Sequence, residues 1–197
     1  MKKLHVGLGK NSYDIMIGEN FFEEFPKYIG EVYSGKKLFV ITDSNVHEIY
    51  EEKYKEMFKG FNYSIFVLQA GEKHKHIGIM PSIYSAMVNE GLTRKDMVVA
   101  FGGGVVGDIA GFAAASYMRG IGFIQIPTTI VSQVDSSVGG KVGVDLPEGK
   151  NLVGAFHQPK LVLIDNYFLN TLTDRYFYDG FGEIVKYGCI YDKKFFD

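Results

Sequence analysis

The residues best suited to chemistry lie in one glycine-rich turn. A buried strand is predicted over residues 97–101 (MVVAF), and GGGVVGD follows it at residues 102–108. This segment fits the pattern G-x-G-x-x-G at Gly102, Gly104 and Gly107. Glycines in a strand-to-helix turn let backbone N–H groups approach a pyrophosphate at the start of a helix. The turn therefore predicts a dinucleotide site, and a glycine turn that only packs a helix on a sheet is the alternative.

The turn departs from the usual dinucleotide fingerprint in two ways. It follows a middle strand of the chain rather than the first strand. The next strand runs into Pro127-Thr128-Thr129 and carries no acid at its end. A carboxylate for a ribose hydroxyl must then come from another loop, such as Asp43 or Glu72.

Polar loops follow three predicted strands, at residues 43–45, 71–75 and 128–129. In an open parallel sheet, ligands bind outside the carboxyl ends of the strands. Carboxylates and Asn45 suit ribose hydroxyls, and Lys75 suits a phosphate. Each loop alone is more typical of a helix cap or a charged turn, but their common placement favours a ligand site.

The segment 132–159 is rich in Gly, Ser and Lys and shows no helix or strand periodicity, so it is predicted to be a long ordered loop. It carries Asp135, Lys141, Lys150 and Asn151 among glycines. Such lysines suit a phosphorylated or carboxylated substrate, and a flexible surface loop is the alternative. Arg119, just after an apolar helix, is predicted to be a second anion ligand or a cation at that helix's C-terminus.

Two further patterns bear on metals. Glu183 and Lys186 stand three residues apart on a predicted helix, and their spacing alone favours an exposed ion pair. The five histidines show no helical metal spacing, and the pair His74 and His76 is more typical of a charged loop tip.

The elements that position these residues alternate between strands and helices. A hairpin is predicted over 2–9 and 13–18, and a short helix, interrupted by Pro26, over 21–29. Further strands are predicted at 37–42, 63–68, 97–101, 123–126 and 161–164, and helices at 45–59, 79–89 and from the glycine turn to 118. This order predicts a Rossmann-like α/β domain with a parallel sheet and helices on both faces. The predicted domains are 1–172, the α/β domain, and 173–197, the start of a helical domain.

Composition excludes several classes of protein. The 197 residues are 46% hydrophobic and carry 21 Lys+Arg against 23 Asp+Glu, which does not suit a nucleic-acid binder. The most apolar segment, 109–118, is too short to span a bilayer, and the N-terminus lacks the apolar run of a signal peptide. The single Cys189 excludes an internal disulfide. We therefore expect a cytoplasmic protein that binds neither nucleic acid nor membrane.

Four stretches together resemble the 3-dehydroquinate synthases. They are GGGVVGDIAGFAAASYMRG (102–120), IPTTIVSQVDSSVGGKVGVD (126–145), GKNLVGAFHQP (149–159) and GFGEIVKYG (180–188). The resemblance implies conversion of 3-deoxy-D-arabino-heptulosonate 7-phosphate, a phosphorylated sugar acid, to 3-dehydroquinate and phosphate. It also implies catalytic NAD, a divalent metal (zinc, or else cobalt) and a homodimer of the full-length protein.

The resemblance also assigns roles to individual residues. Glu183 matches the family's glutamate metal ligand, against the ion-pair interpretation. The substrate and catalytic ligands it implies are Arg119, Asp135, Lys141, Asn151 and Lys186. The NAD contacts it implies are Asp43, Asn45, Gly71, Glu72, Lys75, Gly104, Val105, Val106, Gly107, Asp108, Thr128, Thr129, Lys141, Lys150, Phe168, Leu169, Asn170 and Thr171.

The family completes its metal site with two histidines from a helical C-terminal domain. We therefore expect these 197 residues to be an incomplete, inactive portion of the enzyme that does not hold the metal tightly. The segment TLTDRY (171–176) also departs from the family's usual Thr-Leu-Pro-x-Arg-Glu. Alternatives are another sugar phosphate cyclase, an iron-type polyol dehydrogenase of the same fold, or a non-catalytic nucleotide-binding module.

Overall fold

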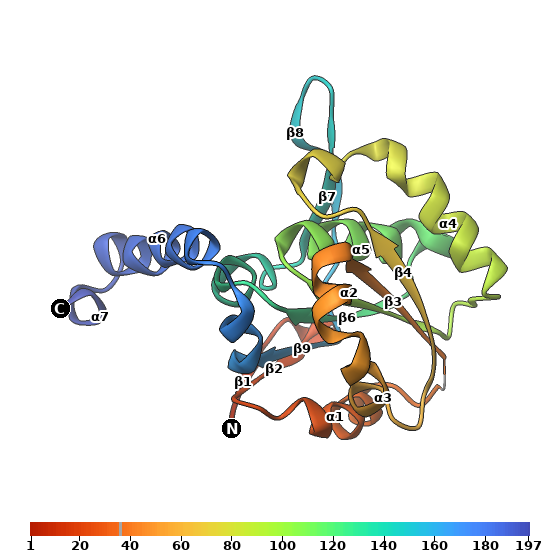
Figure 1. The fold of residues 1–197 in the computed structure, drawn as a ribbon, viewed down its shortest axis with the longest axis horizontal. Coiled ribbons are helices and arrows are strands. Elements are labelled where there is room, and N and C mark those ends of the chain that lie inside the picture. The colour runs from red at the N-terminus through yellow and green to blue at the C-terminus, as the bar shows by residue number, and fades with distance from the viewer. Residues whose placement is uncertain (36) are drawn as a thin grey trace.

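A seven-stranded sheet forms the centre of the computed structural model, which describes residues 1–35 and 37–197 (Figure 1). Its strand order is β1-β2-β9-β6-β5-β3-β4. β1 pairs with β2 in antiparallel fashion, and the other neighbours are parallel. The strands are β1 (Lys2–Val6), β2 (Tyr13–Gly18), β3 (Lys37–Asp43), β4 (Asn62–Leu68), β5 (Met97–Gly102), β6 (Gly122–Pro127) and β9 (Leu161–Asp165).

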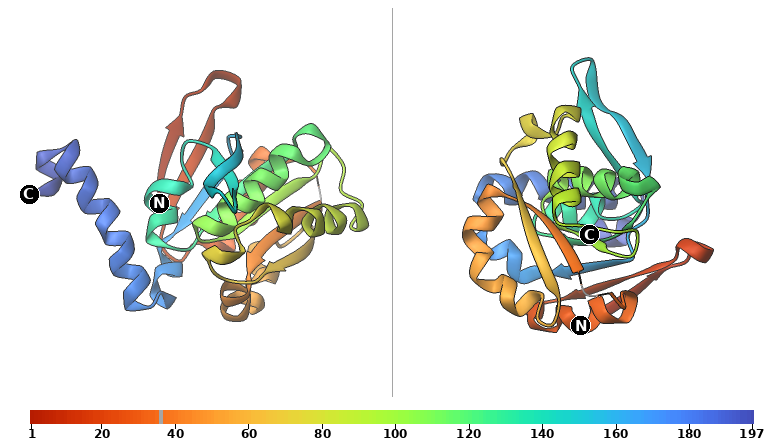
Figure 2. Two further views of the ribbon diagram at one scale, coloured as in Figure 1. Left: turned by 90° about the horizontal axis from the view of Figure 1, so that it is seen from above. Right: turned by 90° about the vertical axis from the view of Figure 1, so that its right-hand side faces the viewer.

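Helices cover both faces of this sheet, as predicted (Figure 2). Alternate residues of a strand point to opposite faces. In β3, Leu38 and Val40 join the core under the first three helices, whereas Phe39 and Ile41 join the core under the next two. The helices are α1 (Phe25–Val32), α2 (Ser44–Tyr50), α3 (Tyr54–Met57), α4 (Met80–Asn89) and α5 (Gly104–Ser116). The predicted α/β class is confirmed.

Two helix predictions were wrong in detail. Pro26 does not interrupt the first helix, because it occupies one of the first two positions of α1. An N–H group there has no acceptor within the helix, so proline can take its place. The single helix predicted over 45–59 is instead α2, a 3₁₀ turn over Glu51–Lys53, and α3. The break lets Tyr50 and Tyr54 both turn into the core beside Phe101, at ring distances of 5.8 and 5.9 Å.

The prediction of a loop without secondary structure over 132–159 was also wrong. A π-helical turn spans Ser132–Ser136, and β7 (Lys141–Leu146) and β8 (Gly149–Phe156) form an antiparallel hairpin that projects from the sheet. The alternation in 141–146 buries Val142 and Val144 against the core beside α5. A Cβ on Gly154 would lie 2.3 Å from the Val142 carbonyl oxygen, so glycine permits the close strand contact and hides the strand pattern.

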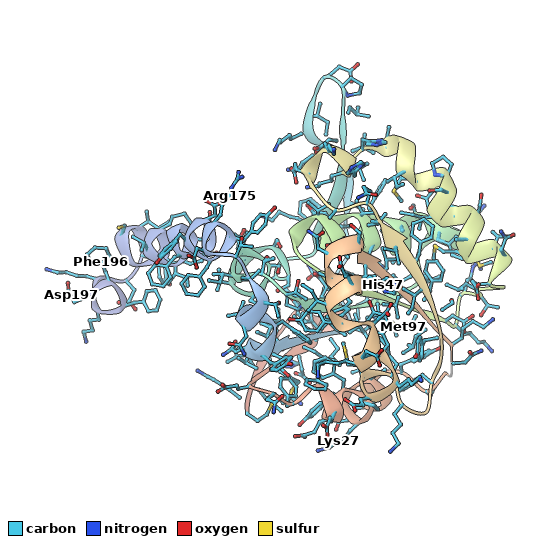
Figure 3. The ribbon with its side chains drawn as sticks, in the orientation of Figure 1. Lys27, His47, Met97, Arg175, Phe196 and Asp197 are labelled. Atoms are coloured by element: carbon cyan, nitrogen blue, oxygen red, sulfur yellow. The ribbon has the colours of Figure 1, made fainter. Side chains whose placement is uncertain are left out.

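The C-terminal segment contains α6 (Asp174–Ile190) and α7 (Lys193–Phe196). Figure 3 shows these helices extending to one side of the sheet, with Phe196 and Asp197 at the far end. Phe196 is 57% exposed, and several other aromatic residues of this segment are also exposed. No helix in the described part of the chain is long and apolar enough to cross a bilayer. That 173–197 begins a separate helical domain stays a prediction.

A candidate dinucleotide and anion site at the carboxyl edge of the sheet

The glycine turn joins the carboxyl end of β5 to α5. Gly103 is the N-cap of α5 and offers no side chain to the N–H groups of the first helical turn. The first bond back to this cap runs from the Gly107 N–H to the Gly103 carbonyl oxygen at 3.0 Å. The N–H groups of Gly104, Val105 and Val106 therefore have no acceptor within the helix, which is the arrangement that binds a phosphate group.

The glycines of the turn do two different things. A Cβ on Gly102 would lie 2.6 Å from Val106, and one on Gly107 would lie 2.9 Å from the buried Gln125, so these two positions serve packing. A Cβ on Gly104 would lie 3.1 Å from the Ser136 hydroxyl. Gly104 therefore keeps the start of α5 open, between the turn and the π-helical segment.

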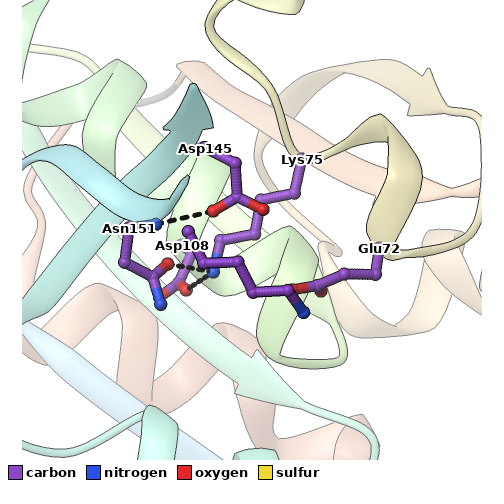
Figure 4. Close-up of polar contacts among 6 residues, drawn as sticks. Glu72, Lys75, Asp108, Asp145 and Asn151 are labelled. Carbon is purple, nitrogen blue, oxygen red and sulfur yellow. Dashed lines mark hydrogen bonds and ion pairs between the residues drawn. The ribbon is translucent and has the colours of Figure 1, made fainter. Parts of the chain in front are cut away.

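Lys75 lies at the centre of the site and is 5% exposed (Figure 4). Its Nζ donates to Asp108 Oδ2 at 2.5 Å and to Asn151 Oδ1 at 2.6 Å. The three residues come from the loop after β4, from α5 and from β8. The structure thus brings together three site residues that the sequence places far apart.

Burial and charge act in opposite directions on Asp108. Burial raises the pKa of its carboxyl group above the ordinary value, and the Lys75 ammonium opposes that rise. The carboxylates of Glu72 and Asp145 add to the rise. Glu72 also pairs with Lys150 at 3.0 Å near the surface, which raises the pKa of Lys150. The buried Lys75 ammonium group therefore pairs with Asp108, and the exposed Lys150 pairs with Glu72.

Two cavities adjoin this cluster. The first, of about 550 Å³, is lined by Asp108, Asp135, Lys141 and Asn151, with Ser136 and the hairpin. The second, of about 420 Å³, lies on the other side of Lys75 and is lined by Glu72, Lys75, Asp145 and Lys150, with His76. The charged residues predicted from the segment 132–159 and from the loop 71–75 thus line one or the other of two cavities beside the Lys75 cluster.

Asp135 is held by a residue that the sequence analysis did not single out. Its Oδ1 accepts a hydrogen bond from the Tyr187 hydroxyl of α6 at 2.8 Å. That bond raises the pKa of the Tyr187 phenol, which keeps it protonated as a donor. Lys186 Nζ lies 4.7 Å from the Tyr187 ring centroid and pairs with Glu183. The stretch GFGEIVKYG contained Tyr187, but nothing in its spacing indicated a partner 52 residues away.

Replacing Tyr187 with phenylalanine is expected to loosen α6 from the π-helical turn, because it removes the Asp135 bond while keeping the ring. The free energy that holds α6 against this turn should fall by about 1 kcal/mol, the usual value for one hydrogen bond. Faster amide hydrogen exchange confined to α6 would report it. Tyr178→Phe is the matched control, because Tyr178 is 71% exposed on the same helix. Equal exchange in the two variants would contradict the role given to Tyr187.

Other predicted site residues have structural roles that limit what they can offer a ligand. Asp43 caps α2, with its Oδ1 accepting from the N–H groups of Asn45 and Val46. Thr129 and Ser132 cap each other's backbone N–H groups, and Thr128 is 4% exposed.

In the segment 168–171, the Phe168 ring is fully buried among aromatic residues and the Thr171 hydroxyl lies 2.6 Å from that of Tyr50. Leu169 is half-buried, and Asn170 and Gly71 are exposed.

Arg119 is the predicted residue that the fold places elsewhere. α5 begins at the carboxyl ends of the strands, and its 13 residues carry the chain back to their amino ends. There the Met118 carbonyl oxygen accepts from Arg94 in the loop before β5. Met118 and Arg119 have φ angles of 50° and 69°, in the left-handed region. Within one copy of the chain, Arg119 therefore does not join the cluster around Lys75.

The predicted metal ligand, Glu183, does not belong to a group of metal-ligating side chains among the described residues. Glu183 is engaged by Lys186, as its spacing suggested, and residues 1–35 and 37–197 contain no group of three His, Cys, Asp or Glu side chains that could hold a metal ion. A catalytic zinc normally has three protein ligands. The residues present do not fit a tightly held metal.

The fold and the site define a class. A crystal structure of 2-deoxy-scyllo-inosose synthase complexed with carbaglucose-6-phosphate, NAD⁺ and Co²⁺ is similar, with a TM-score of 0.87 and 30% identity over 94% of this chain and 50% of that chain. The 2-epi-5-epi-valiolone synthase ValA from Streptomyces hygroscopicus, with NAD⁺ and Zn²⁺ bound, has a TM-score of 0.85 and 30% identity over 96% and 52%. Glycerol dehydrogenase from Schizosaccharomyces pombe, at 20% identity and a TM-score of 0.67, shares the fold. The structural class is that of the α/β half of these synthases.

The family follows from sequence comparison. A family model described as "3-dehydroquinate synthase N-terminal" matches residues 65–179. The 3-dehydroquinate synthase of Clostridium acetobutylicum is 52% identical over all of this chain and 56% of its own length, and that of Clostridium botulinum is 49% identical over all of this chain and 57% of its length. The chain belongs to the 3-dehydroquinate synthase family, and it spans about half the length of these curated relatives.

Proposed function

We propose that this chain is the NAD-binding part of a 3-dehydroquinate synthase, which converts 3-deoxy-D-arabino-heptulosonate 7-phosphate to 3-dehydroquinate and phosphate. The observation that carries the proposal is the joining of Lys75, Asp108 and Asn151 beside the uncapped start of α5. Family membership and the NAD⁺ in the titles of two similar structures support it.

The residues present fit NAD. The free N–H groups at the start of α5 suit the pyrophosphate, and Gly104 leaves room that a side chain would narrow. Asp43 ends β3 and Asn45 follows it, and Thr128 and Thr129 follow β6. These residues lie on either side of the turn, because β3, β5 and β6 are neighbours. When bound, NAD supplies a hydride acceptor that is regenerated within each turnover.

The chain's own residues bind and orient the substrate in this proposal. Lys141 and Asn151 line the first cavity and can donate to a phosphate or a hydroxyl group. Asp135, held by Tyr187, faces the same cavity as an acceptor for a hydroxyl group. Lys186 adds positive charge near Asp135. The cavity therefore offers both donors and an acceptor, as a phosphorylated polyol acid requires.

Glu183 is proposed as one ligand of a divalent metal, which needs further ligands from outside the described residues because these contain no group of three His, Cys, Asp or Glu side chains. A homodimer of the complete protein and a cytoplasmic location are proposed from the family resemblance.

The test is the stoichiometry of the reaction catalysed by the complete protein that contains this chain. With NAD far below the substrate concentration, phosphate release is expected to equal substrate consumed, with 3-dehydroquinate as product and no accumulation of NADH. NADH formed in proportion to substrate would instead identify a polyol dehydrogenase. Phosphate release with a different carbocycle would identify another sugar phosphate cyclase, the class to which the 30% identical structures belong. Binding of NAD without turnover would identify a nucleotide-binding module.

A further inference from the structure

Asp145 is a residue of the cluster to which neither the turn nor the cavity assigns a role. It lies on β7, one residue before the pair Leu146 and Gly149 that closes the turn of the hairpin (Figure 4). Its Oδ1 accepts from the backbone N–H of Asn151 at 2.7 Å, and its own N–H donates to the Lys75 carbonyl oxygen at 2.8 Å. One residue thus holds both Asn151 and Lys75, the two residues that meet at the buried ammonium group.

The bond from Asp145 acts on the backbone of an exposed residue near the start of β8. Asn151 has a φ of 56°, in the left-handed region, which asparagine adopts more readily than most residues other than glycine. Asn151 is exposed, so packing does not fix its conformation. The hydrogen bond from its N–H to the Asp145 carboxylate therefore sets the direction in which its side chain leaves the hairpin.

That direction decides what Asn151 offers a ligand. A lysine ammonium group only donates, so the Asn151 side chain must turn its oxygen toward Lys75. Its Nδ2 then points away from Lys75 and has no acceptor among residues 1–35 and 37–197. Since Asn151 lines the first cavity, both Nδ2 protons are available to oxygen atoms of a bound molecule.

Asp145 itself is placed differently. Its side chain lines the second cavity, with Lys75 and Lys150, and not the first. We propose that Asp145 is a positioning residue, which fixes Asn151 and through it the Lys75 ammonium group for the bound dinucleotide. This inference rests on the proposed NAD site.

Two substitutions separate the hydrogen bond from the charge. Asp145→Ala removes the acceptor for the Asn151 N–H, whereas Asp145→Asn keeps an oxygen atom in the same place. Both keep the backbone bond to Lys75, which holds the hairpin against the loop after β4. In calorimetric titration of the 197-residue chain with NAD, Asp145→Ala is expected to raise Kd about tenfold and Asp145→Asn by no more than about twofold.

A double-mutant cycle distinguishes positioning from a general structural role. Asn151→Gly removes the side chain that Asp145 directs and relieves the left-handed backbone. In that background, Asp145→Ala is expected to change the NAD affinity no further. A structural role would lower the affinity by the same factor in both backgrounds, and that result would overturn the proposal.

A readout without NAD keeps the two proposals apart. In ¹H–¹⁵N spectra of the chain, the Asn151 Nδ2 signals are expected to shift in Asp145→Ala and to stay in place in Asp145→Asn. If the chain shows this pattern but binds no NAD, the proposed function fails and the positioning stands. If the chain binds NAD and the Asn151 signals and the affinity are unchanged in Asp145→Ala, the positioning is refuted and the proposed function stands.

Discussion

Replacing Lys75 with methionine is expected to lower the free energy of unfolding by about 3 kcal/mol and to weaken NAD binding at least about tenfold. Lys75 is 5% exposed, and its Nζ lies 2.5 Å from Asp108 Oδ2. Methionine keeps the length of the side chain but leaves Asp108 as a largely buried carboxylate with no cation. Removing one partner of a buried ion pair costs far more than the pair itself contributes. Urea unfolding and calorimetric titration measure the two effects.

The loss of stability in Lys75→Met should depend on pH in a defined direction. Burial already raises the pKa of Asp108, and without Lys75 that pKa rises further. Between the unfolded value of 3.8 and the raised folded value, the folded chain binds more protons than the unfolded chain. Its stability therefore falls as pH rises through this window. The deficit relative to the unsubstituted chain should be smaller at about pH 4 than at about pH 7.

Two variants test that interpretation of Lys75. Lys75→Met combined with Asp108→Leu removes both partners, and it should regain most of the stability without regaining NAD affinity. Lys150→Met is the matched control, because Lys150 pairs with Glu72 but its side chain is 71% exposed. It should unfold like the unsubstituted chain. Equal destabilisation by Lys75→Met and Lys150→Met would show that burial of the ammonium group does not matter.

Asp165→Ala is expected to lower the free energy of unfolding by about 3 kcal/mol. Asp165 is fully buried at the end of β9, and its carboxylate accepts from the backbone N–H groups of Asn20, Phe21 and Tyr167 at 2.7, 2.7 and 2.9 Å. Alanine leaves these donors without their acceptor and opens a small cavity. The bonds join the segment after β2 to the turn that carries 168–171. In Asp165→Ala, the amide protons of both segments should therefore exchange faster.

Asp192→Ala is the matched control for Asp165. Asp192 also accepts from two backbone N–H groups, those of Lys194 and Phe195, but it is exposed at the start of the short α7. Water can replace the lost acceptor there, so the free energy of unfolding should fall by no more than about 1 kcal/mol, the usual cost of losing a helix cap. The free energy of unfolding of Asp165→Asn should lie between those of Asp165→Ala and Asp192→Ala, because one oxygen atom remains but the amide nitrogen cannot accept from an N–H group. An Asp165→Ala variant as stable as Asp192→Ala would refute the role of these bonds.

The sequence predicted the sheet because its signals were local. Alternating strands and helices gave the α/β class, and the glycine turn after 97–101 lies where the G-x-G-x-x-G pattern placed it. Lys75 was named because it follows a strand, Asn151 because it lies on the segment 132–159, and Asp108 from the family resemblance. Their meeting at one ammonium group depends on the sheet order, which no local pattern contains.

The predictions failed where distant residues decide local structure. The hairpin of β7 and β8 was missed because Gly143 and Gly154, needed for close strand contact, interrupt the strand pattern. Arg119 was predicted to be an anion ligand or a cation at a helix C-terminus; α5 takes it away from Lys75 within one copy of the chain, and its role as an anion ligand stays a prediction. Tyr187 has a role only through its partner Asp135, 52 residues away.

The most direct test of the NAD site is a calorimetric titration of NAD into the 197-residue chain and two glycine variants. One molecule of NAD should bind per chain. Gly104→Ala, which puts a methyl group where the start of α5 meets Ser136, should weaken binding at least about tenfold without unfolding the chain. Gly30→Ala, on the exposed side of α1 with nothing within 4 Å, should leave the affinity unchanged. A folded chain that binds no NAD, or that binds equally well with alanine at position 104, would contradict the account.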